Sequence, residues 1–298
     1  MSDPALQELR GFDIVGGLLY VVNAYKDYSQ ILIYEADGDD GYSFKEVFAS
    51  KDTVNSILHP YDLTFDPQGY CYISSQDTNV VTVLEGKDSP LQIASYLQLQ
   101  YPPPPNFLAG TIAASSVGAL PGIPTPTPPD VAEPLGLGAS LTNDKNPSVA
   151  NSVRGVLLYG GYLFVADEPV NAVKLYDGGT GELHGQIAGD NLSAPVQLLL
   201  SASTNILYIS SSGNDSVVSY DLSKGVPSGT VAPKLFIDGN VKHISGMSFD
   251  ADGNFYAAER KAKAIRMFPP DGSGSGKHFI TDLPDEPEFI LYVPKADD

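Results

Sequence analysis

Four basic side chains stand at matching places in a repeated pattern, where each repeat begins its first strand. They are Arg10, His59, Arg154 and His243, in a chain with 17 basic and 36 acidic residues. If they line one opening, the guanidinium groups can hold a carboxylate or another anion, while a histidine, which titrates near neutral pH, moves a proton. That chemistry suits a metal-free lyase, isomerase or cyclase. The alternative is that these cations pair with the nearby acids Asp13 and Asp62 and fix the strand entries.

A second set of polar residues ends another strand of each repeat, three positions after its central aromatic residue. The set comprises Asn23, Ser75, Asp167, Ser211 and Glu259. Because equivalent positions of a repeat lie at the same end of a repeating fold, we expect these side chains to face one end. The alternative is that they only terminate strands and bond to loops.

The strands that must position both sets form five similar units. Each central strand runs from a glycine or asparagine, through a central aromatic residue, to a polar residue; these strands are residues 17–23, 69–75, 161–167, 205–211 and 253–259. A short strand and a turn precede each central strand, as in Phe65-Asp-Pro-Gln-Gly69, and a further alternating strand follows. This pattern predicts antiparallel meanders with tight turns.

Units that recur every 44–52 residues cannot bury both sheet faces alone, so the sequence predicts a β-propeller of four-stranded antiparallel blades around a central channel. The central aromatics Tyr72 and Phe164 are 92 residues apart, nearly two periods. We therefore expect six blades, with a degenerate one in that interval, and five blades as the alternative. Residues 1–298 are expected to form a single domain.

The interval contains a proline-rich insertion at about 98–150. Ten of the 24 prolines lie between Pro102 and Pro134, and proline lacks the N–H that a sheet ladder needs. The alternatives are a surface excursion without function, a lid over one end of the propeller, or a site for a protein partner. At the other end of the sequence, Pro287–Val293 is predicted to be a last strand that closes the ring.

The two repeats around Phe249-Asp-Ala-Asp-Gly-Asn-Phe-Tyr256 and Phe65-Asp-Pro-Gln-Gly-Tyr-Cys-Tyr72 resemble those of the NHL-repeat and SMP-30 (gluconolactonase)-like propellers. The resemblance covers most of the chain outside the insertion. It implies a small-molecule enzyme, with hydrolysis of a lactone or ester at the mouth of the central channel as the leading expectation. The alternatives are the metal-free chemistry above and a non-catalytic binding propeller.

In the calcium-dependent lactonases of this family, oxygen ligands from different blades hold one divalent ion over the channel. The resemblance carries that role to Asn23, Asp167 and Glu259. The ion, expected to be calcium, would polarise the substrate carbonyl, and His59 or His243 would move the proton. The family's Glu-Gly-Pro motif is matched only by Glu286-Pro-Glu288.

Composition excludes several other classes. A net charge of −19 repels phosphate backbones and anionic lipid, so we expect no nucleic acid and no membrane as partners of this acidic protein. The single cysteine, Cys71, lies in an apolar run and is expected to be a buried structural thiol. No secretory signal is visible at the start, so the sequence leaves open a soluble cytoplasmic protein or a secreted one whose signal has been removed.

Overall fold

The computed structural model describes residues 6–24, 28–38, 41–54, 57–66, 69–78, 80–85, 152–178 and 183–293. The proline-rich insertion at about 98–150 lies outside these residues, as does the degenerate blade expected beside it. In the part of the chain that is described, no helix is long and apolar enough to cross a membrane.

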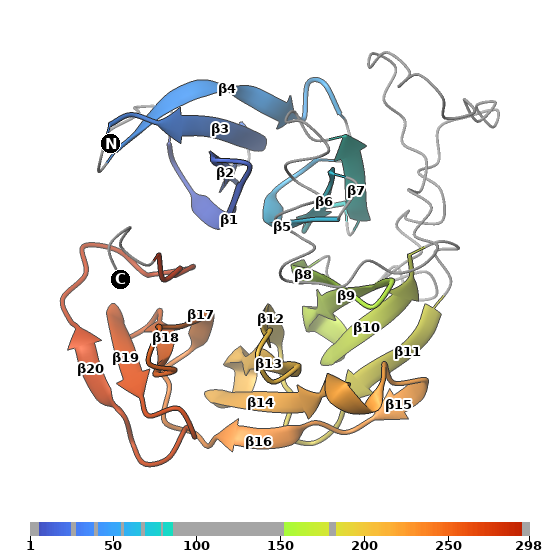
Figure 1. Ribbon diagram of the computed structural model, residues 1–298, viewed down its shortest axis with the longest axis vertical. Coiled ribbons are helices and arrows are strands. Elements are labelled where there is room, and N and C mark those ends of the chain that lie inside the picture. Colours follow the sequence, from blue (N-terminus) through green and yellow to red (C-terminus); the bar gives the residue numbers. More distant parts are fainter. Residues whose placement is uncertain are drawn as a thin grey trace.

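Five sheets, antiparallel except for one added edge strand, surround a common centre, each with its first strand innermost (Figure 1). Three have four strands. They are β1 (Leu9–Val15), β2 (Leu18–Asn23), β3 (Gln30–Ala36) and β4 (Tyr42–Ser50) in blade 1; β12 (Pro195–Ser201), β13 (Ile206–Ser211), β14 (Ser216–Asp221) and β16 (Lys234–Ile237) in blade 4; and β17 (Ile244–Phe249), β18 (Phe255–Glu259), β19 (Ala264–Phe268) and β20 (Lys277–Ile280) in blade 5.

The other two blades depart from four strands. Blade 2 contains β5 (Pro60–Phe65), β6 (Tyr70–Ser75) and β7 (Val80–Glu85). Blade 3 contains β8 (Val153–Tyr159), β9 (Tyr162–Asp167), β10 (Ala172–Asp177) and β11 (Leu183–Ala188), and β15 (Gly229–Val231) adds to β11 in parallel. Short 3₁₀ turns occupy Glu168–Val170, Ser212–Asn214 and Leu222–Lys224.

The preference for six blades was therefore wrong, and the described residues form the five-bladed alternative. The 92-residue interval that favoured six blades runs largely outside the described residues, and its proline content disfavours a sheet ladder. The propeller architecture and the antiparallel blades were correctly predicted. Alternation of apolar residues over short strands was the signal that carried them.

The innermost strands pack directly on one another, and a shared irregularity allows this. In all five, the pairing with the second strand shifts register two residues after the strand starts, as between Val153 and Val156. Gly155 sits in this bulge of β8, where a Cβ would lie 2.6 Å from the carbonyl oxygen of Val196 on β12. Only glycine permits that approach.

Side chains in the bulges also join neighbouring blades. Asp62 of β5 accepts a hydrogen bond from the backbone N–H of Val156 in blade 3 (3.1 Å). At the equivalent position of blade 4, Gln197 accepts one from the N–H of Met247 in blade 5. These bonds satisfy buried backbone donors across the blade junctions, where a lost partner is costly.

Residues 284–293, called the tail below, run between β17 and β1, as the sequence led us to expect of a ring-closing segment (Figure 1). They are not paired as a strand. A Cβ on Gly246 would meet Phe289 Cα (2.8 Å), Glu288 O and Ile290 N. A Cβ on Gly155 would meet the equivalent three backbone atoms of β12, namely Val196 O, Gln197 Cα and Leu198 N. The tail therefore occupies the place of a sixth innermost strand.

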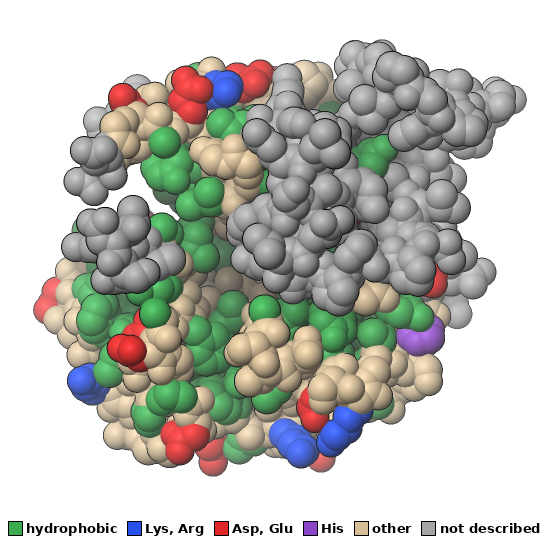
Figure 2. Space-filling view, viewed as in Figure 1, with side chains coloured by type: hydrophobic (Ala, Val, Ile, Leu, Met, Phe, Trp, Pro, Cys, Tyr) green, Lys and Arg blue, Asp and Glu red, His purple; other side chains and the backbone are tan. Residues whose placement is uncertain are grey.

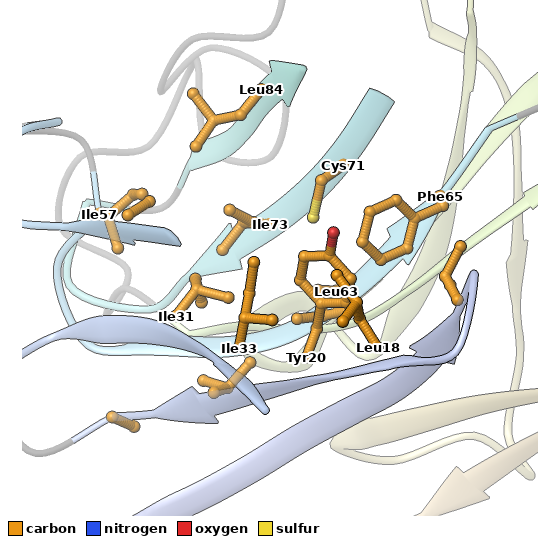
Figure 3. Close-up of a cluster of buried hydrophobic side chains, with 14 residues drawn as sticks. Leu18, Tyr20, Ile31, Ile33, Ile57, Leu63, Phe65, Cys71, Ile73 and Leu84 are labelled. Carbon is orange, nitrogen blue, oxygen red and sulfur yellow. The ribbon is translucent and has the colours of Figure 1, made fainter. Parts of the chain in front are cut away.

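The largest part of the core fills the spaces between the blades. Between blades 1 and 2 it includes Tyr20, Ile33, Phe65 and Cys71, all buried (Figure 3). Cys71 is a free thiol in this cluster, which confirms its structural role, and burial raises its pKa well above the ordinary value.

Candidate functional site

Both predicted sets of polar residues lie at one end of the propeller, where the innermost strands begin and the second strands end. We call this end the mouth. The strand pairing fixes it: Leu9 lies opposite Asn23, Val153 opposite Asp167 and Ile244 opposite Glu259. The observed register therefore puts these positions at the same end of the propeller, as we expected.

Three blades bring charged and aromatic groups together at the mouth. The guanidinium carbon of Arg154, from blade 3, lies 4.7 Å from the ring centroid of Tyr61 in blade 2. That of Arg10, from blade 1, lies 5.6 Å from the same centroid. Two cations that share one aromatic ring at these distances gain from its negative face. The bulge places all three residues, because each is the second residue of an innermost strand.

Glutamates pair with the arginines, and not Asp13 and Asp62 as in the alternative drawn from the sequence. Arg154 binds Glu168 through Nε (2.9 Å) and Nη2 (2.8 Å). Arg10 forms ion pairs with Glu8 and Glu288. Burial alone would lower the pKa of Arg10, but Glu288, Tyr61 and Glu8 together raise it above the ordinary value.

Glu288 links the tail to this cluster. It lies 2.8 Å from Arg260, and its Oε2 is 3.5 Å from the hydroxyl of Tyr61. Tyr61 is buried, and burial followed by the charge of Glu288 raises its pKa far above the ordinary value. The phenol therefore stays protonated and can donate to this carboxylate.

His59 and His243 occupy equivalent places before β5 and β17, with backbone φ angles of 52° and 55°. The imidazole of His59 is half-buried and lies near two carboxylates, Asp77 (3.3 Å from Nδ1) and Glu8 (3.7 Å from Nε2). For His243 the structure shows backbone contacts: its N–H donates to Asp215 (2.7 Å), and its carbonyl accepts from Arg260. His59 thus joins Arg10 through Glu8, whereas His243 is tied to Asp215.

The predicted metal ligands have partners within their own surroundings. Asn23 Oδ1 accepts from the N–H of Gln7, and Asp167 lies 2.9 Å from Lys174 Nζ. Glu259 is fully buried and contacts Arg266 Nε (3.1 Å), His278 Nε2 (2.9 Å) and the N–H of Lys242 (2.8 Å). Cations thus already neutralise both carboxylates, an arrangement that does not fit a divalent ion as they stand.

Among the described residues, no group of three or more His, Cys, Asp or Glu side chains is placed to hold a metal ion. The calcium site at Asn23, Asp167 and Glu259 therefore stays a prediction, and no catalytic step below passes through it.

Two further acids, Asp13 and Asp62, lie on the innermost strands β1 and β5. Asp62 is buried, and burial, partly opposed by hydrogen bonds from the N–H groups of Val156 and Leu63, raises its pKa to about 7. Burial likewise raises the pKa of Asp13 to about 7, against the N–H of Ile14. Asp62 therefore joins blade 2 to blade 3, whereas Asp13 accepts from its neighbour Ile14 within β1.

A cleft of about 780 Å³ opens beside the mouth, between blade 1 and the tail. Its charged end is formed by Glu8, Arg10, Arg260, Asp285, Glu286 and Glu288. Its apolar walls include Phe12, Ile14 and Val21 from blade 1 and Leu291 and Val293 from the tail. In the space-filling view hydrophobic side chains show at the hollow on the left of the molecule (Figure 2).

Sequence reasoning gave Tyr61 no role and named Glu288 only as part of a motif match, although both residues connect the cations of the mouth. A signal for Tyr61 was present, since it occupies in blade 2 the place that Arg10 and Arg154 take in blades 1 and 3. Glu288 occupies the same place in the tail, within Glu286-Pro287-Glu288-Phe289, which parallels Ala194-Pro195-Val196-Gln197.

Comparisons with known proteins agree on the fold. No family model matches the chain, and no curated protein matches its sequence. Virginiamycin B lyase from Staphylococcus aureus superimposes with a TM-score of 0.54 at 13% identity, covering 96% of this chain and 75% of that one. A streptogramin B lyase gives 0.53 at 13%, with 99% and 76% coverage. A chain of a nidogen/laminin complex gives 0.58 at 13%, with 98% and 86% coverage. At this identity the likeness shows the β-propeller fold alone.

Proposed function

We propose that this protein is a small-molecule enzyme of the metal-free lyase, isomerase or cyclase type, which acts on an anionic compound at the mouth. The observation that carries the proposal is the meeting of Arg10 and Arg154, from two blades, over the ring of Tyr61 from a third. The likeness of the fold to two proteins named as lyases supports this choice over hydrolysis. Hydrolysis of a lactone or ester stays a prediction from the sequence.

Arg154 is the residue we assign to substrate binding. Glu168 engages Nε and Nη2, and Nη1 has no protein acceptor among the described residues. Its side chain is 18% exposed, so solvent and a ligand can reach it. A guanidinium with one free edge can bind a carboxylate by charge-assisted hydrogen bonds. Arg10, by contrast, is held between Glu8 and Glu288 and acts as a positioning residue for Tyr61 and the tail.

His59 is the residue we assign to proton transfer. Its ring lies beside Asp77 and Glu8, which orient it and stabilise the imidazolium formed when it accepts a proton. In an elimination, His59 takes the proton on the carbon next to the substrate carboxylate. The electron pair of that C–H bond forms the new C=C bond, and the bond to the leaving group breaks. The leaving group takes a proton from water or from the imidazolium.

The test follows a panel of small carboxylates with a leaving group at the β carbon, and a matched panel of lactones and esters, by NMR. We expect turnover of a carboxylate that EDTA does not change. His59→Gln should lower kcat by roughly 10²–10⁴-fold. Arg154→Met should raise KM, and Arg154→Lys should restore part of the binding. Lys45→Ala, on the exposed edge of blade 1, serves as the control.

Three results would contradict the proposal. Turnover of lactones that EDTA abolishes would restore the calcium site at Asn23, Asp167 and Glu259. Activity unchanged in His59→Gln and Arg154→Met would move the site away from these residues. Carboxylate binding without turnover in the whole panel would leave a non-catalytic binding propeller. A partner bound through the proline-rich insertion stays a separate proposal, outside the described residues.

A further inference from the structure

The tail has the place of an innermost strand but lacks a second strand beside it. In the five blades the innermost strand pairs with the next strand in the chain. Among the described residues, the hydrogen bonds of the tail backbone over 287–293 are from Ser245 Oγ to the carbonyl of Pro287 and from the N–H of Tyr292 to Ser248 Oγ. Both partners lie on β17, so the edge of the tail away from the centre is free to pair.

Side chains of the tail alternate in the way of a strand. Phe289, Leu291 and Val293 line the cleft against blade 1. Ile290 and Tyr292 line a second cavity of about 330 Å³ against blade 5, where Leu291 also reaches. No residue of 284–293 has a positive φ, so the segment is free of left-handed turns. Successive side chains of the tail thus point to opposite sides, and apolar residues lie on both sides. This pattern is typical of a strand that is buried on both faces.

Exposed apolar side chains gather around this place. Of the twelve large hydrophobic side chains that are exposed in the described residues, six line the two cavities: Leu9, Phe279, Ile280, Leu291, Tyr292 and Val293. Val293 is 59% and Phe279 58% exposed. Apolar patches concentrated in this way mark surfaces that a partner covers.

We propose that an extended β-strand of another polypeptide adds to the free edge of the tail and completes a sixth blade. This surface continues the interface that blades already share, because the tail packs on Gly246 as β12 packs on Gly155. The strand fits between blade 1 and blade 5, so it is apolar on both faces, like β13 with its Ile-Leu-Tyr-Ile run. Main-chain hydrogen bonds supply affinity and the two cavities supply selectivity.

Charge fixes one end of the partner. A second strand runs antiparallel to the innermost one, so its carboxyl-terminal end arrives at the mouth. There the charged end of the cleft carries four acidic residues and two arginines, a balance of 2 − 4 = −2. The partner strand therefore ends on lysine or arginine at that side.

The probe is a synthetic peptide with the sequence of residues 204–211, Thr-Asn-Ile-Leu-Tyr-Ile-Ser-Ser, followed by two lysines. We expect it to bind the full chain, measured by fluorescence anisotropy, and to slow hydrogen exchange at residues 289–293. Leu291→Asp combined with Val293→Asp should weaken binding at least 10-fold. Both positions are exposed, so the fold tolerates these changes. Leu183→Asp, at an equally exposed apolar position of blade 3, should leave binding unchanged.

Two variants of the peptide test separately whether binding needs strand pairing and whether it needs the positive charge. Proline in place of the central Leu and Tyr of the peptide should abolish binding, and two glutamates in place of the lysines should weaken it. The proposal is overturned if exchange at 289–293 is already slow in the free protein, if the double substitution leaves binding intact, or if light scattering shows a dimer that the double substitution dissociates. The last result would make a second copy the occupant.

Discussion

The junction between blades 3 and 4 and the junction between blade 5 and blade 1 begin alike and finish differently. At the first, Gly155 of β8 lies against the backbone of Gln197, and the apolar side chains of β9 and β13, including Phe164 and Leu207, fill the space farther out. At the second, Gly246 lies against the backbone of Phe289 in the same way. Farther out, however, the cleft of about 780 Å³ remains open.

The contrast separates two requirements of a propeller ring. Close approach of the innermost strands needs a bulge and a small residue, and a segment of a few residues can meet it. Sealing the space between blades needs second and third strands with apolar faces. The tail meets the first requirement and leaves the second unmet, so the ring is held at its centre and open at its rim.

The largest predicted effect is a pH dependence of the free energy of unfolding. It arises at the junctions of blades 1, 2 and 3, which, unlike the junction between blade 5 and blade 1, are filled by side chains. Asp13 and Asp62, near the junctions of blades 1, 2 and 3, have pKa values raised to about 7. A folded pKa above the unfolded one means that the stabilising contribution is present below about pH 4 and is lost as pH rises to about 7. We expect a loss on the order of 4 kcal/mol for Asp62 across this window.

Denaturation with urea at several pH values measures the effect. Asp62→Asn keeps an acceptor oxygen without the charge, so it should flatten the profile and be more stable than the original chain at pH 8. Equal slopes in the two proteins would mean that Asp62 is not protonated in the fold.

The next largest loss of stability is expected when the glycine at each of the two junctions is replaced by alanine. In Gly155→Ala the new Cβ would lie 2.6 Å from Val196 O, on a strand fixed on both sides, and we expect a loss of about 3 kcal/mol. In Gly246→Ala the contact is Phe289 Cα at 2.8 Å, on a tail that can shift, and we expect about 1 kcal/mol. Calorimetric melting of both variants compares them; equal losses would mean that the tail is as fixed as β12.

The anchoring of the tail gives an intermediate effect. Glu288→Gln removes the charge that pairs with both Arg10 and Arg260, whose side chains are 10% and 25% exposed. We expect a loss of about 2 kcal/mol, because two partly buried guanidiniums lose a partner. Hydrogen exchange should quicken in the tail and stay unchanged in β12. Uniform quickening would show that Glu288 supports the whole ring.

The smallest effect is expected at the rim of blade 1. Lys45 and Glu35 form an ion pair at 3.2 Å with both side chains at least 40% exposed. Lys45→Ala should change the free energy of unfolding by less than about 0.5 kcal/mol, since exposed pairs contribute little. A larger loss would show that the outer strands hold the blade more than the innermost packing does.

Local patterns predicted much of this fold. Turn residues and short apolar runs placed the strands around Tyr72, Phe164 and Tyr208, which are buried along nearly their whole length. The number of blades was mispredicted because chain length between Tyr72 and Phe164 was counted as strand, although proline in that interval cannot donate to a ladder.

The site was predicted in part for a physical reason. Arg10, His59, Arg154 and His243 all lie at one end, because register fixes where each strand begins, but the two histidines stand two residues before the place that the two arginines share. Repeat position could not foresee the partners of Asp167 and Glu259. Lys174, Arg266 and His278 come from the next strands of the same blades, and their reach depends on side-chain conformation rather than on spacing.

The central claim is that the tail holds the ring at its centre while its outer edge is free. Hydrogen exchange of the free protein, read amide by amide, tests it most directly. We predict fast exchange at Ile290, Leu291 and Val293, and slow exchange at Leu198, Leu199 and Leu200 in β12, with Tyr292 in between because it donates to Ser248. Equal protection of the two segments would contradict the account, since the tail edge would then already be paired.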